Sequence, residues 1–108
     1  MDELRENERA ALKELKARLA RDFGLVELKL FGSKARGDSS PESDVDLVVV
    51  VREHNWQTDF RIYGVCFRIG LAHDVLLAPV IYSQTEYESD LTRATPFYKA
   101  VAAQGVSL

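Results

Sequence analysis

Two aspartates, Asp44 and Asp46, are the residues of this chain whose type and spacing most directly suggest chemistry. They lie two positions apart, at the start of an apolar run over 47–51. On a strand, side chains two positions apart project from the same face, so these carboxylates repel each other unless a cation lies between them. Carboxylate oxygens suit Mg²⁺, which keeps several waters and shares its other positions with substrate phosphates. The pair therefore predicts a site for a metal ion and a nucleotide.

A second candidate segment, Leu30–Gly37, runs from a predicted strand into a Gly-Ser turn with two cations. Backbone N–H groups at such a turn can bind an anion, and Gly32 lets a phosphate approach the backbone closely. Ser33 adds a hydroxyl, while Lys34 and Arg36 add positive charge. The spacing matches neither the Walker A motif nor the dinucleotide fingerprint. The segment predicts a different kind of phosphate site, on a strand next to the aspartates.

The elements that position these residues follow from hydrophobic periodicity and from helix-capping residues. These signals predict helices over 2–22, 55–71 and 96–105 and strands over 26–31, 46–51 and 74–82. A hairpin broken at Gly64 is the alternative for 55–71. Because 47–51 is apolar and β-branched without a break, this strand is expected to be central and covered on both faces. Pro79 indicates an edge strand or a bulge in the last strand. The pattern favours an α/β architecture.

Outside these segments, the side chains have ordinary structural interpretations. One apolar stripe at helical spacing consists of Trp56, Phe60, Tyr63, Phe67 and Leu71. Such a stripe is usually part of a core, but it can also face a partner. Cys66 is expected in the core. His54 and His73 have no partners at a metal-binding spacing and are expected at the surface or in turns.

Length and composition indicate one compact domain, 1–108. The chain has 108 residues, 46% of them hydrophobic, and a net charge of −3. That charge disfavours a dedicated nucleic-acid-binding module, which is usually basic. No apolar run approaches the ~20 residues needed to span a bilayer. A single cysteine excludes an intrachain disulfide and a cysteine-based zinc cluster, so a reducing cytoplasm is the expected location.

The two chemical segments together resemble a known signature. A Gly-Ser pair, ten further residues and then Asp-x-Asp is similar to the signature of the nucleotidyltransferase superfamily that includes DNA polymerase β. Phe31-Gly-Ser-Lys-Ala-Arg-Gly37 with Ser43-Asp-Val-Asp-Leu47 looks most like its smallest members, the minimal nucleotidyltransferases. The resemblance covers residues 28–50 closely. It implies a nucleotidyltransferase fold, with a small mixed sheet flanked by helices.

The resemblance also implies roles for individual residues. The metal ligands and catalytic residues would be Asp44 and Asp46, which match the signature, and Asp74, whose match is looser. Nucleotide binding would fall to Gly32, Ser33, Lys34, Arg36 and Ser43. The full mechanism uses two Mg²⁺ ions and transfers a nucleoside monophosphate, AMP if the substrate is ATP, to an acceptor hydroxyl with release of pyrophosphate.

The expected acceptor follows from the size of the chain. Larger relatives add a domain that carries the acceptor surface, whereas minimal members commonly pair with a small helical HEPN protein, an RNase toxin that they modify and neutralise. An antitoxin of that type is the leading expectation. The alternatives are a non-catalytic nucleotide-binding module that neutralises its partner by occlusion, and a drug-modifying nucleotidyltransferase of the aminoglycoside type working with a separate helical subunit.

Overall fold

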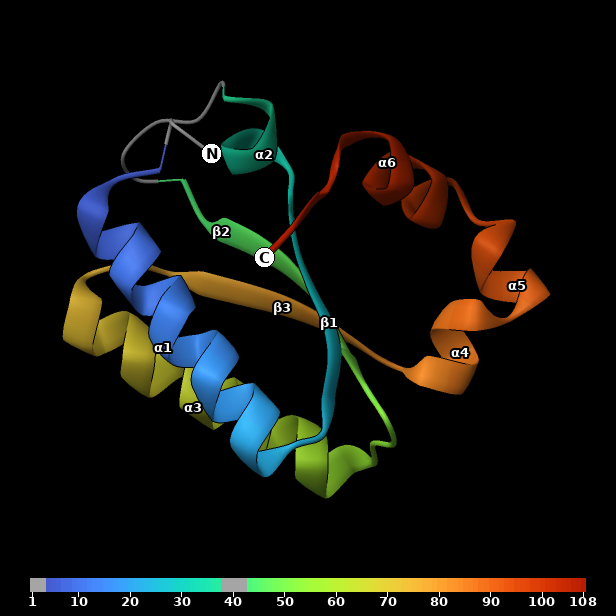
Figure 1. Cartoon of the computed structure of the whole chain (residues 1–108), viewed down its shortest axis with the longest axis horizontal. Helices are drawn as coiled ribbons and strands as arrows, with labels where there is room; N and C mark the ends of the chain where they lie inside the picture. The colour runs from blue at the N-terminus through green and yellow to red at the C-terminus, as the bar shows by residue number, and fades with distance from the viewer. Residues whose placement is uncertain (1–3, 38–42) are drawn as a thin grey trace.

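The computed structural model describes residues 4–37 and 43–108 (Figure 1). Helices and strands alternate at first, and three short helices then follow the third long strand. In chain order the elements are α1 (Glu6–Asp22), β1 (Leu25–Phe31), α2 (Ser33–Arg36), β2 (Val45–Val51), α3 (Trp56–His73), β3 (Leu77–Ser83), α4 (Gln84–Glu88), α5 (Asp90–Arg93), α6 (Pro96–Gln104) and β4 (Val106–Ser107). In this part of the chain, no helix is long and apolar enough to cross a membrane.

The strands form one mixed sheet in the order β3-β2-β1-β4. β1 is antiparallel to both β2 and β4, whereas β2 and β3 are parallel and are joined through α3. A parallel pair needs such a crossover, because its strands must start at the same edge of the sheet. The expected central position of β2 and the expected edge position of the strand that contains Pro79 are both confirmed.

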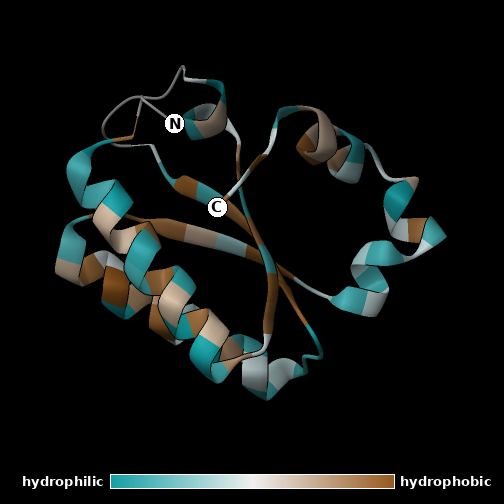
Figure 2. Cartoon of the chain, in the orientation of Figure 1, coloured by the Kyte–Doolittle hydropathy of each residue, from teal (hydrophilic) through white to brown (hydrophobic). Residues whose placement is uncertain are grey.

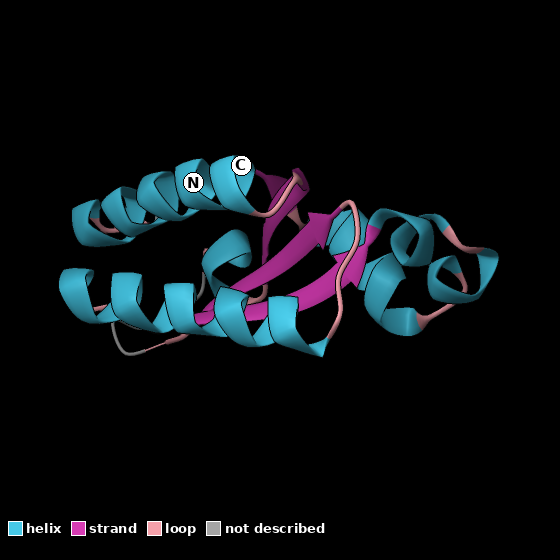
Figure 3. Cartoon of the chain, turned by 90° about the horizontal axis from the view of Figure 1, so that it is seen from below, coloured by secondary structure: helices cyan, strands magenta, loops and turns pink. Residues whose placement is uncertain are grey.

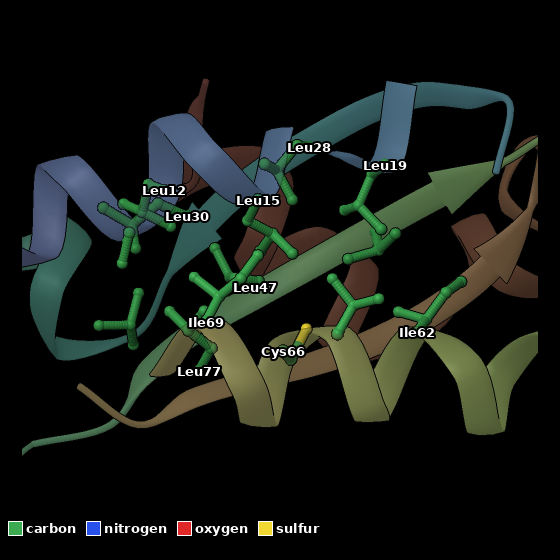
Figure 4. Packing of buried hydrophobic residues seen from close by; sticks show 14 of the residues in the cluster. Leu12, Leu15, Leu19, Leu28, Leu30, Leu47, Ile62, Cys66, Ile69 and Leu77 are labelled. Atoms are coloured by element: carbon green, nitrogen blue, oxygen red, sulfur yellow. The ribbon is translucent and has the colours of Figure 1, made fainter. Parts of the chain in front are cut away.

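One face of the sheet is covered by α1 and α3, which contain most of the core (Figure 4). The odd-numbered residues of β2, such as Leu47 and Val49, point into this layer. From the helices, Leu15 and Leu19 of α1 meet Ile62 of α3 and its neighbours in the same cluster. The apolar face predicted for α1 is therefore confirmed.

The other face is covered in part by α4 and α6, which lie with α5 on the opposite side of the sheet from α1 and α3 (Figure 3). Val48 and Val50, the even-numbered residues of β2, pack there with Tyr87 of α4 and Val101 of α6. β2 is consequently buried on both sides, as its uninterrupted apolar sequence predicts.

The helical period of α3 was predicted correctly, but its buried face was not. Its core-facing residues are Ile62, Val65, Cys66 and Ile69. The aromatic stripe, for which a core position was the first interpretation, is exposed on the opposite side of the helix, where apolar residues continue along α3 (Figure 2). Both faces of α3 are apolar, so the spacing of its aromatic residues alone could not identify the side that meets the sheet.

His54, between β2 and α3, links α3 of the first helical layer to α4 of the second. Its Nδ1 lies 2.7 Å from Oδ1 of Asp59 on α3, and its Nε2 lies 2.6 Å from Oε1 of Glu86 on α4. Partial burial opposes the charged imidazolium, but the two carboxylates outweigh it and raise the pKa of His54. Both ring nitrogens then donate, and the imidazolium ties α3 to α4.

We expect this contribution to stability to depend on pH. Because the pKa of His54 is raised in the folded state, the contribution is complete below the unfolded pKa and is lost as pH rises through the folded pKa. His54→Gln should therefore cost about 0.5–1 kcal/mol near pH 5.5 and almost nothing near pH 9. Urea unfolding of both proteins at the two pH values measures the difference. An equal cost at both values would contradict the charged bridge.

Candidate active site

Asp46 and Gly32 are in direct contact at the centre of the site. β1 and β2 pair Phe31 with Asp46, which brings the next residue, Gly32, against the carboxylate. A Cβ atom built on Gly32 would lie 2.5 Å from Oδ2 of Asp46, and Gly32 has φ +74°, a conformation that favours glycine. The predicted juxtaposition of the Gly-Ser turn and the Asp-x-Asp pair is therefore present, and only glycine fits at position 32.

The two aspartates lie on the sheet face that α4–α6 cover only in part. Asp44 and Asp46 have the same alternation as Val48 and Val50, whose side chains pack against those helices. Asp44 is exposed and Asp46 is half-buried. The dyad thus lies where this face of the sheet is open to solvent.

The electrostatics of the dyad fit a cation. Burial raises the pKa of Asp46, and the negative charge of Asp44 raises it further, while the cation of Arg36 acts in the opposite direction. A bound cation would favour the charged form of Asp46, and the oxygens of both aspartates are hard donors of the kind that Mg²⁺ prefers. Asp44 and Asp46 therefore form a chemically suitable pair of metal ligands.

The Gly-Ser turn continues into α2, a single helical turn beside the dyad. Backbone N–H groups of Ala35 and Arg36 donate to the carbonyl of Gly32, which closes this turn. Ser33 is half-buried at its first position, and the exposed Arg36 is near enough to Asp46 to influence its pKa. Gly32, Ser33 and Arg36 are thus grouped with the dyad, as predicted.

Lys34 is not grouped with them, which corrects its predicted place in the phosphate site. Its Nζ lies 2.6 Å from Oε2 of Glu8 on α1, and both side chains are only 2% exposed. The second oxygen of Glu8, Oε1, accepts the backbone N–H of Arg5 at 2.7 Å and so caps α1. The physical reason is the helical geometry of α2, in which the Lys34 side chain points to the α1 side.

Glu8 is the residue that inspection of the sequence missed. It occupies a core-facing position on α1, four residues after Leu4 and three before Ala11, and all three are buried. A carboxylate at such a position requires a buried partner, because an isolated charge in a core is strongly unfavourable. This requirement could have identified Glu8 from the sequence as a buried carboxylate with a cationic partner. In the structure that partner is Lys34.

Asp74 and Ser43 lie on the other side of the structure from the dyad's open face. Both line a cavity of about 540 Å³ with Glu8 of α1 and Gly70 of α3. Asp74 ends α3 in the left-handed conformation, with φ 57° and ψ 47°, and β3 begins only at Leu77. The predicted strand over 74–82 therefore began too early.

The pairing of β2 with β3 explains why Asp74 does not complete the site. The residue beside Asp46 is Ala78, four positions after Asp74. Among the described residues, no three carboxylate, imidazole or thiol groups are placed to hold one metal ion. The prediction of Asp74 as a third ligand is thus not supported by its position, and the described part of the site has two carboxylates.

We expect Asp74→Asn to bind a nucleotide in the presence of Mg²⁺ within about 3-fold of the wild type, whereas Asp46→Asn loses more than about 100-fold. Asparagine tolerates the left-handed conformation, so the end of α3 is preserved. Titration of each protein with a fluorescent ATP analogue measures the effect. Equal losses in the two variants would place Asp74 in the metal site after all.

The comparisons with known proteins agree with this geometry. The family model described as "Nucleotidyltransferase domain" matches residues 12–98, which include both the Gly-Ser turn and the dyad. A solved structure described as "Structure of putative minimal nucleotidyltransferase" has a TM-score of 0.64 with this chain at 25% sequence identity, and the match covers 93% of this chain and 91% of that one. The mixed sheet flanked by helices is the fold expected from the resemblance.

Two curated proteins of Methanocaldococcus jannaschii are also similar. "Putative protein adenylyltransferase MJ0141" is 42% identical over 57 residues, a match that covers 52% of this chain and only 58% of the length of that relative. "Putative protein adenylyltransferase MJ0604" is 28% identical over 102 residues, covering 92% of this chain and 95% of that protein. With most of its length matched by the family model, and with the glycine and aspartates of the signature in contact, the chain belongs to the nucleotidyltransferase domain family.

Proposed function

We propose that this chain is a Mg²⁺-dependent adenylyltransferase that transfers AMP from ATP to a hydroxyl group of a partner protein. The observation that carries the proposal is the contact between Gly32 and the Asp46 carboxylate, with Asp44 beside it on an open sheet face. Both similar curated proteins are named as protein adenylyltransferases, which supports a protein as the acceptor.

In the proposed reaction the acceptor hydroxyl attacks the α-phosphorus of ATP and loses its proton to solvent as the new P–O bond forms. The bond from the α-phosphorus to the oxygen that bridges it to the β-phosphate breaks, and pyrophosphate leaves. Asp44 and Asp46 would hold Mg²⁺, which would supply charge neutralisation for the phosphates. The turn at Gly32 would let the triphosphate lie close to the backbone, and Arg36 would add positive charge. The chain thereby contributes mainly positioning and charge neutralisation.

For the partner, we propose a small helical HEPN protein with RNase activity, which this chain modifies and neutralises as a cytoplasmic antitoxin. The support is the resemblance to minimal nucleotidyltransferases, one of which has the same fold. The sheet face with the dyad is open, so a large acceptor can reach it.

Intact-mass spectrometry tests the proposal directly. The product of the neighbouring gene, which we propose to be the HEPN-family partner, is incubated with the chain, ATP and Mg²⁺, and Asp44→Asn is the matched control. We expect the partner to gain the mass of one or more AMP groups only with the wild-type chain. A stable complex without any mass gain would contradict transfer and favour the second candidate.

That second candidate is a nucleotide-binding module that neutralises its partner by occlusion alone. The position of Asp74 favours it, because the described part of the site lacks a third carboxylate beside the dyad. The two candidates differ in one observable property. Both require nucleotide binding at Asp44 and Asp46, but only the first releases pyrophosphate.

A further inference from the structure

The outer face of α3 is an exposed apolar stripe that neither the fold nor the active site uses. Trp56 and Phe60 are each 75% exposed, Phe67 is 63% exposed, Leu71 is 68% exposed and Tyr63 is 50% exposed. Their spacing places them on one side of α3, opposite the residues that pack under the sheet. Within α3, no charged residue falls inside this stripe. Asp59, which pairs with His54, lies along one edge of it, and Arg61 and Arg68 lie beyond the other.

The stripe is large enough for a stable protein interface. A buried aromatic side chain contributes about 150–250 Å² of surface, so the four aromatic residues alone expose about 500 Å². A standard interface buries about 800 Å² on each partner, and monomers rarely expose apolar patches of more than a few hundred Å². Leu71, the fifth residue of the stripe, and its neighbour Leu76, which is 58% exposed, bring the patch close to the size of a standard interface.

The order of residues in the stripe is symmetric about the middle of the helix. The point midway between Tyr63 and Gly64 is also equally distant from Phe60 and Phe67, and from Trp56 and Leu71. If a second copy of α3 lies antiparallel on the first, every large residue therefore meets a defined counterpart. Phenylalanine meets phenylalanine, Trp56 meets Leu71, and the central Tyr63 meets Gly64, which has no side chain to obstruct it.

A groove at the end of the stripe provides a place for the largest of these residues. It has a volume of about 310 Å³ and is lined mainly by apolar side chains of α3 and of the segment that leads into β3, among them Leu71, Val75 and Leu76. In the antiparallel arrangement, Trp56 of one copy reaches this groove on the other. Aromatic side chains that fill such pockets are typical interface hot spots.

We propose that α3 is the interface of a twofold-symmetric homodimer, in which two copies of the stripe pack antiparallel about the point between Tyr63 and Gly64. This interface is isologous, because the same surface is used by both copies. It also faces away from the sheet, whereas Asp44 and Asp46 lie on the opposite sheet face. Both active sites of the dimer remain open, and dimerisation is independent of the proposed transfer reaction.

The oligomeric state of the purified chain, measured by sedimentation velocity across a dilution series, is the first test. We expect a dimer, and we expect Phe60→Glu and Phe67→Glu each to raise its dissociation constant at least about 30-fold, the effect of losing one hot spot. Leu91→Glu is the matched control, because Leu91 is 82% exposed on α5, outside the stripe. A wild-type chain that stays monomeric at about 100 µM would overturn the proposal.

Cysteine cross-linking tests the predicted register. Tyr63→Cys places two cysteines beside the twofold axis and should form an interchain disulfide under mild oxidation. Trp56→Cys alone should not, because its two copies are about 22 Å apart along the helix. Adding Leu71→Cys to Trp56→Cys should restore the cross-link. Native Cys66 is buried, which limits background reaction.

Cross-linking of Trp56→Cys alone, or none of Tyr63→Cys, would overturn the antiparallel register. A wild-type chain that is monomeric but binds the HEPN protein through the stripe would also overturn the homodimer, and would assign the stripe to that partner. Metal-dependent nucleotide binding, measured on the same samples, reports separately on the proposed function.

Discussion

Asp44→Asn is expected to abolish nucleotidyl transfer while leaving the metal-free protein at least as stable as the wild type. Removing a group that only orients a metal ligand already costs about 10–100-fold in affinity, so removing a ligand itself should lower activity by more than about 100-fold. The stability follows from electrostatics. Asp44 raises the pKa of Asp46 by repulsion, and asparagine removes that repulsion.

Pyrophosphate release and thermal unfolding in EDTA measure the two halves of this prediction. Glu53→Gln is the control, because Glu53 is an exposed acid beyond the other end of β2 and should leave both quantities unchanged. If Asp44→Asn lowers the metal-free melting temperature by several degrees, the aspartates do not form a repulsive pair of metal ligands, and the site as described is wrong.

Lys34→Met is expected to destabilise the fold by about 3–5 kcal/mol, since it leaves the Glu8 carboxylate buried without its partner. The double variant Lys34→Met/Glu8→Leu removes both charges and should recover most of that loss. About 1 kcal/mol should remain missing, because Glu8 also accepts the backbone N–H of Arg5 at the start of α1.

Urea unfolding of the wild type, both single variants and the double variant gives the coupling energy of the pair. Arg36→Met is a matched control: it removes an exposed cation from the same short helix and should change stability only slightly. Additive effects of the two single changes would show that Glu8 and Lys34 do not interact as the structure places them.

Much of the architecture follows from local sequence patterns. The apolar face of α1, the buried strand β2 and the contact between the Gly-Ser turn and Asp46 could all be predicted, because each depends on spacing over a few residues or on the family signature. The strand order also follows in part, since Pro79 indicates an edge position.

The errors arise where a residue's role depends on distant parts of the chain. Lys34 was predicted to bind phosphate, but α1 brings Glu8 to it. Asp74 was predicted as a third metal ligand at the start of a strand, but the β2–β3 register places Ala78 beside Asp46. The short helices α4 and α5 went unpredicted. Local signals for them exist, namely the capping box formed by Ser83 with Glu86 and the cap formed by Ser89.

The central claim is that Asp44 and Asp46 hold a metal ion and a nucleotide against the Gly32 turn. Calorimetric titration tests it most directly, with a non-hydrolysable ATP analogue added to the wild-type chain first in Mg²⁺ and then in EDTA. We predict saturable binding that requires the metal and is lost in Asp46→Asn. Because the pKa of Asp46 is raised, affinity should also begin to fall at a higher pH than for an ordinary aspartate as the solution is acidified. Binding of equal strength in EDTA, or unchanged binding by Asp46→Asn, would contradict the account.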